Sequence, residues 1–205
     1  MTRQERAART RCELVHAAAV LFEQQGFAQT TLNGICREVG VSSGALHFHF
    51  ENKAAIANAI EEKASSTLRH TVSRQRPRRA GALQELIDTS HVLVAQLRDD
   101  LIVRSGVRLS HDIARQGGPA FRQEWQARVR ALLEEAKEDG SLAPGVSVAE
   151  VAATVTLATV GLMALGRSDT EWLSGSSVTG FWRLVLPQLA GADFADRLDP
   201  CGAAA

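Results

Sequence analysis

The segment from Thr30 to Lys53, which reads TTLNGICREVGVSSGALHFHFENK, decides the fold. Apolar side chains recur at helical spacing up to Val39, and Gly40 is placed to end that helix. Ser42 is placed to cap a second short helix that we expect to run to about Phe48. Two short helices joined by a glycine-containing turn over about twenty residues have the size of a helix-turn-helix.

The two predicted helices divide into an apolar side and a polar side. A helix-turn-helix buries a small core and leaves one face of its second helix free for the major groove of DNA. The residues suited to the core are Ile35, Val39, Val41, Leu46 and Phe50. The small or polar residues left for the outer face are Ser42, Ser43, Gly44, Ala45, His47 and His49. Such a face offers donors, acceptors and room for the backbone to approach base edges.

Helical periodicity continues on both sides of this segment, and strand alternation is hard to find. We expect a helix over about 4–25 that Gly26 ends, and one from a cap at Asn52 to about residue 72. Further helices are predicted over 83–97, 101–114, 119–138, 147–166 and 176–189. Ser147 and Glu150 have the spacing of a capping box, Pro119 suits a first turn, and Pro187 should kink or end the last helix. The segment 151–166 is apolar all round and should be buried on several sides.

Composition limits the class of protein. The 205 residues are 45% apolar with three cysteines, which suits one medium domain or a small domain fused to a larger one, in a reducing compartment. No secretory signal is visible, because Met1 leads into a charged segment. The longest uncharged apolar stretch, 151–166, is shorter than the roughly 18 residues that span a bilayer. We therefore expect a soluble, cytoplasmic protein with no membrane partner.

Net charge at first argues against a nucleic-acid partner. The 23 basic and 23 acidic side chains cancel, whereas DNA-binding proteins commonly carry positive charge. The charges are unevenly distributed, however: residues 1–79 hold 12 basic and 7 acidic side chains, and residues 134–205 hold 4 and 10. This polarity along the chain is compatible with an N-terminal end that faces DNA.

The run from Thr30 to Lys53 resembles the N-terminal DNA-binding domain of TetR-family transcriptional repressors, and the likeness covers about residues 8–60. It implies an all-α, TetR-like fold: a three-helix helix-turn-helix domain over 1–52, a larger effector-binding and dimerisation domain over 53–190, and a tail over 191–205. In that family the second short helix reads DNA, and a lysine that starts the fourth helix contacts phosphate; Lys53 matches it. His47 stands where the family usually has tyrosine, so contact with a base, a phosphate or neither stays open.

Ten residues are candidates for DNA contact, each with a structural alternative. Ser42, Thr30 and Thr31 could serve only as helix caps, and the N-terminal arginines could be an ordinary solvated face or a basic arm on the DNA backbone. His47 and His49 lack the neighbouring cysteine or carboxylate cluster of a metal site, so we expect no metal, no cofactor and no catalytic residue. The candidates are Arg3, Arg11, Thr30, Thr31, Ser42, Ser43, Gly44, His47, His49 and Lys53.

The middle of the chain resembles, more loosely, the γ-butyrolactone receptors of actinobacteria. The residues that carry this likeness are Gly44–Leu46, Phe48–Phe50, Val103–Leu109, Glu124 and Trp125. In that subgroup a tryptophan at the position of Trp125 lines the ligand pocket, although Trp125 could instead fill the core. Thr156, Thr159 and Leu162 are further candidates, although hydroxyls in apolar helices usually bond back to a carbonyl four residues earlier. A furan, butenolide or antibiotic-like effector stays possible.

The resemblance implies a homodimeric repressor that binds a near-palindromic operator, is released by a small-molecule autoregulator and controls secondary metabolism. The segments 151–166 and 176–189 could form the dimer interface or only the monomer core. An enzyme is not expected, because no nucleophile elbow, zinc-protease motif or phosphate loop is found. A regulator that senses an antibiotic, a protein partner or no ligand remains the alternative.

Overall fold

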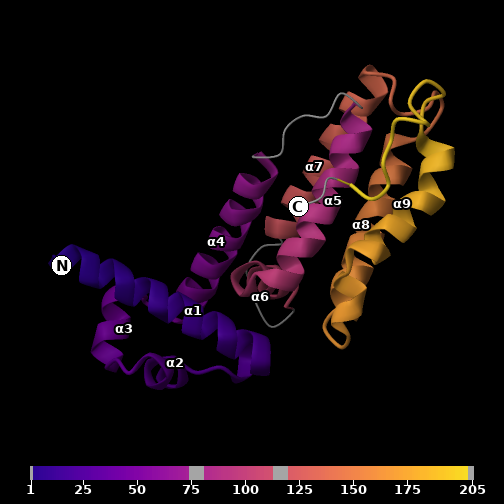
Figure 1. Cartoon of the computed structure of the whole chain (residues 1–205). Coiled ribbons are helices and arrows are strands. Elements are labelled where there is room, and N and C mark those ends of the chain that lie inside the picture. Colours follow the sequence, from indigo (N-terminus) through magenta and orange to yellow (C-terminus); the bar gives the residue numbers. More distant parts are fainter. Residues whose placement is uncertain (1, 74–80, 113–119, 203–205) are drawn as a thin grey trace. The chain divides into compact units, whose positions relative to one another are not determined.

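The computed structural model describes residues 2–73, 81–112 and 120–202, and within these ranges the regular elements are helices (Figure 1). An isolated bridge between Leu142 and Ala190 is the one extended pairing there. The predicted all-α class is therefore confirmed. The chain forms two compact units: unit 1 comprises 1–68 and 100–121, and unit 2 comprises 69–99 and 122–205. The division at residues 52, 53 and 190 stays a prediction.

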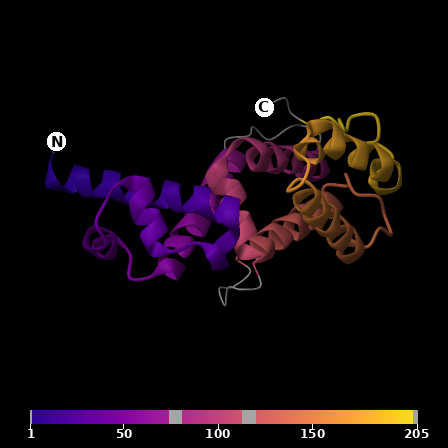
Figure 2. The ribbon, with the colours of Figure 1, turned by 90° about the horizontal axis from the view of Figure 1, so that it is seen from below.

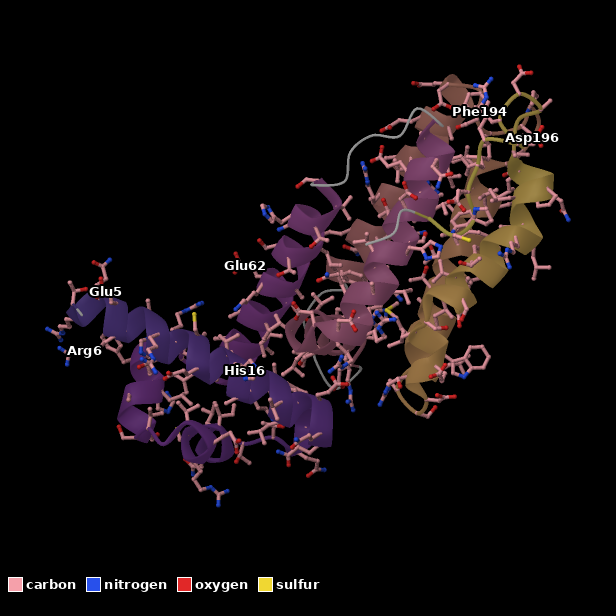
Figure 3. The ribbon with its side chains drawn as sticks, in the orientation of Figure 1. Glu5, Arg6, His16, Glu62, Phe194 and Asp196 are labelled. Carbon is pink, nitrogen blue, oxygen red and sulfur yellow. The ribbon has the colours of Figure 1, made fainter. Side chains whose placement is uncertain are left out.

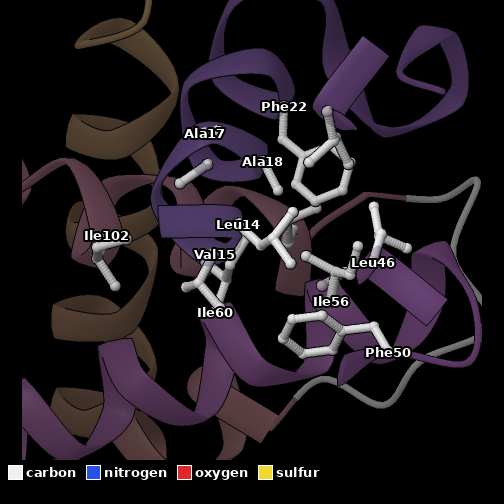
Figure 4. Packing of buried hydrophobic residues seen from close by; sticks show 14 of the residues in the cluster. Leu14, Val15, Ala17, Ala18, Phe22, Leu46, Phe50, Ile56, Ile60 and Ile102 are labelled. Atoms are coloured by element: carbon white, nitrogen blue, oxygen red, sulfur yellow. The ribbon is translucent and has the colours of Figure 1, made fainter. Parts of the chain in front are cut away.

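Unit 1 is built around α1 (Arg3–Gln29), which packs against α2 (Leu32–Val39) and α6 (Leu101–Ser110). With α3 (Ser43–His49) and the first part of α4 (Lys53–Ser73) these helices enclose one apolar core (Figure 4). Leu14, Ala18 and Phe22 recur every four residues on α1 and are at most 2% exposed. Leu46 and Ile56, both fully buried, meet them from α3 and α4. This core fixes the orientation of the two short helices.

The C-terminal end of α1 differs from its prediction. Gly26 does not end the helix but kinks it, with φ 82° and ψ 165°, and helical residues continue to Gln29. Next to the kink, the Arg108 guanidinium from α6 donates to the Glu23 carbonyl. Arg104 and Arg108 both lie 3.6 Å from the Glu23 carboxylate. Ionic contacts thus tie α6 to α1.

Gly106 places α6 against α4. A Cβ at this position would lie 2.5 Å from the Ala64 Cβ and 3.2 Å from the Ile60 carbonyl oxygen, so the backbones approach too closely for any side chain. The predicted helix over 101–114 is shorter here, because Ser110 is its last residue and His111 its cap. Positions 113 and 114, like Pro119, lie outside the described residues.

Unit 2 contains α5 (Ala82–Asp99), nearly all of α7 (Ala120–Glu138), α8 (Val148–Leu165), the short 3-10 helix η1 (Thr170–Leu173) and α9 (Gly175–Leu189). The four long helices lie alongside one another (Figures 1 and 2). α5 is the most enclosed of them and contacts both α9 and η1. Ser147 accepts a hydrogen bond from the Glu150 N–H at 3.4 Å, which is one of the two bonds of the predicted capping box. The helix η1 was not predicted. Pro187 does not end α9, which runs two residues further.

The described part of the predicted tail, residues 191–202, is folded onto unit 2. The Gln84 side chain on α5 accepts from the Asp199 N–H at 2.7 Å and donates to the Asp199 carbonyl at 3.1 Å. His91, two turns further along α5, lies 2.9 Å from the Pro200 carbonyl oxygen, and Leu198 is buried. Phe194 and Asp196 lie just beyond the end of α9 (Figure 3). This segment therefore belongs to the fold of unit 2 up to Gly202.

Candidate functional site

Local hydrogen bonds shape the helix-turn-helix in unit 1. Thr31 caps α2 by accepting from the Gly34 N–H at 3.1 Å, and Ser42 caps α3 by accepting from the Ala45 N–H at 3.2 Å. Gly40 closes α2 with φ 74°, a left-handed conformation that favours glycine, and donates to the Cys36 carbonyl. The caps predicted from the sequence for both helices are confirmed.

The outer face of α3 consists of the residues predicted for it. Ser42, Ser43, Gly44 and His47 are exposed and His49 is half-buried, whereas Leu46 and Phe50 point into the core. Gly44 has no atom within 3.9 Å of a hypothetical Cβ, so its backbone is open to approach. The face therefore presents two hydroxyls, two imidazoles and free backbone, which is the chemistry that reads base edges and phosphates.

One exposed residue of this face was missed from the sequence. Phe48 is 76% exposed on α3, and its ring packs edge-on against His49 with centroids 5.0 Å apart. An exposed phenylalanine beside polar residues can contact a thymine methyl group or a deoxyribose. Its position could have indicated this: residues two places apart on a helix lie about 200° apart, and Leu46 and Phe50, on either side of Phe48, were both predicted for the core.

The arginines of α1 form part of a regular helix. Arg3 is exposed in the first turn, which Thr2 and Glu5 close with a reciprocal capping box, so the predicted basic arm is helical in this structure. Glu5 and Arg6 lie at the N-terminal end of α1, and His16 lies further along it (Figure 3). The Arg11 guanidinium lies over the Phe50 ring, 5.0 Å from its centroid. Arg11 is therefore held next to the end of α3.

Lys53 has partners inside unit 1. Its ammonium donates to the carbonyls of Phe27, Ala28 and Thr30 at 2.7, 3.3 and 2.8 Å, and lies 4.4 Å from the Phe27 ring centroid. These are carbonyls at the end of α1, where a cation is favoured by the helix dipole. Burial lowers the pKa of Lys53, and the charge of Asp112 opposes that shift. Lys53 thus joins α4 to the turn before α2, and its contact with a phosphate stays a prediction.

Thr30 corrects an expectation from the sequence. Its side chain is 1% exposed and donates to the Gly26 carbonyl at 2.9 Å, so it completes the end of α1 instead of facing outward. The adjacent Thr31 is the exposed cap. Sequence alone could not choose between two neighbouring threonines, because the choice depends on how the end of α1 packs.

The four candidate effector residues all lie in unit 2. Trp125 on α7 is 7% exposed, and its indole Nε1 has no hydrogen-bond partner among the described residues. On α8, Thr156 donates to the Ala152 carbonyl at 2.7 Å and Thr159 to the Val155 carbonyl at 2.8 Å, as hydroxyls in apolar helices usually do. Leu162 is half-buried. Among the four candidates, therefore, only Trp125 has a side-chain N–H or O–H group that donates to no acceptor within the described residues.

An open hollow of about 480 Å³ lies elsewhere in unit 2. Its lining is mostly acidic: Gly81, Ala82, Glu85, Glu135, Glu138 and Asp139. None of the candidate effector residues contributes to it. Burial raises the pKa of Asp139, but hydrogen bonds from the Ser141 side chain and from the N–H groups of Ala82 and Ser141 outweigh it and leave that pKa below its usual value. Asp139 thus caps the start of α5.

α8 corrects another expectation, because only 22% of it is buried in the single chain. Leu157 is 73% exposed on this helix, and Leu184 is 78% exposed on α9. Leu165 and Trp172 are also exposed. By length and composition α8 is the one described helix that could cross a membrane. Within the described part of the single chain, most of the apolar outer face of α8 is therefore exposed.

Comparison with known proteins identifies the family. Residues 14–60 match the model of the N-terminal domain of bacterial regulatory proteins of the tetR family. The A-factor receptor protein of Streptomyces griseus is 29% identical over 98% of this chain and 71% of its own length.

Two solved structures extend the likeness to the whole fold. Full-length TylP, a TetR regulator from Streptomyces fradiae, is 32% identical and covers 94% of this chain and 92% of its own, with a TM-score of 0.72. A γ-butyrolactone receptor described as ArpA-like is 26% identical over 94% of this chain and 93% of its own, with a TM-score of 0.77. The chain belongs to the TetR family of bacterial transcriptional regulators.

Proposed function

We propose that this protein is a homodimeric repressor that binds a near-palindromic operator and is released by a small-molecule autoregulator of γ-butyrolactone, furan or butenolide type. The observation that carries the proposal is the extent of the likeness. A shared helix-turn-helix alone would support DNA binding, but the similarity to the A-factor receptor spans 98% of the chain and so includes the helices of unit 2. The chain is a regulator and not an enzyme.

The DNA contact is made by α3 and the elements beside it. Ser42, Ser43, Gly44 and His47, with Phe48, face the major groove, and His47 donates to a base or a phosphate. The sugar-phosphate backbone of the DNA is contacted by further residues of the same unit: Arg3, Arg11, Thr31, His49 and Lys53. Two copies related by a two-fold axis read half-sites spaced by about one helical turn, ~10 bp.

The partner of the apolar face on α8 and α9 is a second copy of the chain. Leu157 and Leu184 are the most exposed leucines of the two helices, and a two-fold axis can bring two such helix pairs into one four-helix interface. Burial of this face in a dimer also explains why so apolar a helix occurs in a DNA-binding regulator without a membrane. The protein acts in the cytoplasm, where its operator is.

The effector binds in unit 2 beside Trp125, with Thr156, Thr159 and Leu162 as further contacts. Because the related receptors are named for A-factor and γ-butyrolactone, a small lactone is the first effector class to test. The effector lowers operator affinity by favouring a conformation of the dimer that fits the operator less well. The genes that we propose it controls are those of secondary metabolism.

A gel-shift titration tests the proposal. Purified protein is mixed with the promoter DNA that flanks its own gene, and with unrelated DNA of equal length, at two salt concentrations. We expect specific, salt-sensitive binding that a 2-acyl-γ-butyrolactone reverses. If the protein binds no neighbouring promoter specifically, the repressor assignment is wrong. Binding that no lactone, furan or butenolide reverses would favour a regulator of the alternative class, which senses an antibiotic, a protein partner or no ligand.

A further inference from the structure

Phe48 on α3 differs from the other exposed apolar residues by its location. Among the described residues of unit 1 it is the one large apolar side chain that is exposed, at 76%. The others all lie in unit 2, and they are Leu157, Leu165, Trp172 and Leu184. Isolated apolar residues are common on protein surfaces, so exposure alone assigns no role to Phe48. Its position on α3 does assign one.

Gly44 and Phe48 form the side of α3 that is farthest from the core. Successive residues of a helix are rotated by about 100°, so a residue two places from Leu46 points about 200° away from it. Leu46 is fully buried, and Gly44 and Phe48 lie two places before and two places after it. Being four residues apart, they lie one above the other on one face of the helix. We call Gly44 and Phe48 the outer ridge of α3.

The polar residues of α3 lie beside the outer ridge. Ser43 and His47 each precede a ridge residue, so they lie about 100° around the helix from it, and both are exposed. The half-buried His49 lies on the other side. When the second helix of a helix-turn-helix lies in the major groove, its outermost face is directed at the base edges, whereas its sides are directed at the sugar-phosphate walls. Phe48 is therefore directed at a base and not at a deoxyribose.

Local contacts prepare Phe48 for this position. Its ring packs edge-on against the His49 ring, with centroids 5.0 Å apart and planes at 83°, which restricts where the phenyl ring can point. One turn earlier, the nearest atom to a hypothetical Cβ on Gly44 is the Ser42 hydroxyl oxygen at 3.9 Å, so the backbone is free to approach the groove closely. The ring can thus reach a base edge without rearrangement of the helix.

The chemistry of the major groove selects the base. Guanine, adenine and cytosine present only donors and acceptors there, whereas thymine also presents its C5-methyl group. A phenyl ring against a donor or acceptor removes water without replacing its hydrogen bond, which is unfavourable. Against a methyl group, the ring buries apolar surface of both partners.

We infer that Phe48 reads the C5-methyl group of a thymine in each half-site and so determines part of the operator sequence. This inference rests on the proposed function, since it names a base that the proposed repressor recognises. It assigns sequence preference to an apolar contact on the outer ridge, next to the hydrogen-bonding residues beside it.

Replacement of thymine by uracil tests the inference, because it removes only the C5-methyl group. The promoter DNA that flanks the gene is narrowed to the operator by footprinting, and each thymine of a half-site is replaced by deoxyuridine, symmetrically in both half-sites. Fluorescence anisotropy then gives the Kd of the wild type for each duplex. We expect one position at which the replacement weakens binding roughly 10- to 20-fold, since each of two buried methyl groups contributes about fourfold.

Variants of Phe48 connect that methyl group to the ring. Phe48→Ala should bind the thymine operator more weakly than the wild type and should bind its thymine and uracil forms equally. Phe48→Leu, which stays apolar, should keep part of the preference for thymine. The matched control on the same helix is His47→Ala, which should lower the affinity for both forms by the same factor. Because Phe48 is 76% exposed, the Tm of its variants should equal that of the wild type.

Addition of a methyl group provides the converse measurement. At the same operator position, a pair of cytosine with guanine is compared with a pair of 5-methylcytosine with guanine, which differs only by the methyl group in the major groove. The wild type should bind the methylated duplex more tightly, by up to about fourfold per half-site. Phe48→Ala should not distinguish the two duplexes.

The outcomes separate the inference from the proposed function. Specific operator binding in which no uracil replacement weakens the wild type more than Phe48→Ala overturns the inference and leaves the proposed repressor intact. Equal weakening by Phe48→Ala on the thymine and uracil duplexes indicates a contact with deoxyribose, and it overturns the inference in the same way. A wild type that binds no promoter specifically overturns the proposed function, and the inference with it.

Discussion

The helices α3 and α8 both expose a face in the single chain, and the two faces have opposite chemistry. On α3 the exposed residues are serines, a glycine, a histidine and one aromatic ring, with Leu46 pointing inward. On α8 only 22% of the helix is buried, and what it exposes is mostly apolar, with Leu157 at 73%. A polar face keeps its hydrogen bonds with water until DNA replaces it, whereas an apolar face of this extent requires a partner.

The two helices also obtain their positions differently. α3 has seven residues and begins at a Ser42 cap, so its placement depends on local hydrogen bonds and on a few core contacts. α8 has eighteen residues and contacts η1 in its own chain, but most of its apolar surface has no partner there. The role of each helix in this chain therefore follows from the side chains that it exposes, polar on α3 and apolar on α8, more than from its length.

The largest expected effect is loss of the dimer. Leu157→Asp combined with Leu184→Asp should place four carboxylates in the proposed interface, which disfavours its burial. We expect monomers by analytical ultracentrifugation and operator affinity at least about 100-fold weaker, because two linked half-site contacts gain that much over one. Gln126→Asp, at an exposed position of α7, is the control and should stay dimeric. A dimeric double variant would contradict the assignment of the apolar face.

A large effect on DNA binding is expected from Gly44→Ala. The added Cβ has free space in the protein alone, and alanine favours a helix over glycine by about 1 kcal/mol, so the Tm should stay equal or rise. Operator affinity should fall by about tenfold or more, because the methyl group blocks the approach of the backbone to the groove. Unchanged affinity in gel shifts would remove Gly44 from the interface.

Gly106→Ala supplies the opposite case. The alanine Cβ would lie 2.5 Å from the Ala64 Cβ. We expect this overpacking to lower the free energy of unfolding by about 1–3 kcal/mol, and therefore to lower the Tm in thermal unfolding.

A moderate effect on stability is expected from Lys53→Met. The variant keeps most of the aliphatic part of the side chain but loses three hydrogen bonds to carbonyls at the end of α1. We therefore expect the free energy of unfolding to fall by roughly 1–3 kcal/mol, measured by thermal or urea unfolding. Lys63→Met, at an exposed lysine on the same helix, is the control. If Lys53 also contacts phosphate, Lys53→Ala weakens binding to all DNA sequences and flattens the dependence of log affinity on log salt. A normal Tm with a flattened salt slope would favour the phosphate role alone.

The smallest expected effect concerns Asp139 and pH. Its pKa is lowered in the folded state, so its carboxylate stabilises unit 2 above the unfolded value of about 3.8, and this contribution is lost as the pH falls through the folded pKa. As the pH is lowered from about 6 to about 3, the Tm of Asp139→Asn should therefore fall less steeply than the Tm of the wild type. Parallel curves for the two proteins would show that the cap of α5 does not depend on the charge.

Much of the helix-turn-helix could be predicted from the sequence because its determinants are local. Thr31, Ser42 and Asn52 accept from N–H groups three residues ahead, and Gly40 supplies the left-handed turn, so spacing alone reveals them. The apolar residues Ile35, Leu46 and Phe50 were predicted for the core and are buried there. The outer face follows by exclusion, although Phe48 was missed because its apolar ring does not look like a DNA contact.

The rest could not be predicted, because it depends on residues far apart in the chain. The partners of Lys53 lie 23 to 26 residues away from it, and Asp199, which pairs with the Gln84 side chain, lies 115 residues away from it. The burial of 151–166 was overestimated for a related reason: apolarity predicts that a face will be covered but not whether the cover comes from the same chain. The contact of Arg11 with Phe50 and the burial of Thr30 likewise depend on how α1 packs.

The amino-acid sequence alone determines the helical class, the capped turn between α2 and α3 and the polar face of α3, because these follow from periodicity and from hydrogen bonds within one turn of a helix. Only the tertiary structure decides that Thr30 is buried, that Lys53 holds the end of α1 and that residues 191–202 pack on α5. It also decides that the buried polar atoms of Thr89 and Trp182 have no hydrogen-bond partner among the described residues. The physical reason is that burial and hydrogen-bond satisfaction are properties of three-dimensional neighbours, which no local spacing specifies.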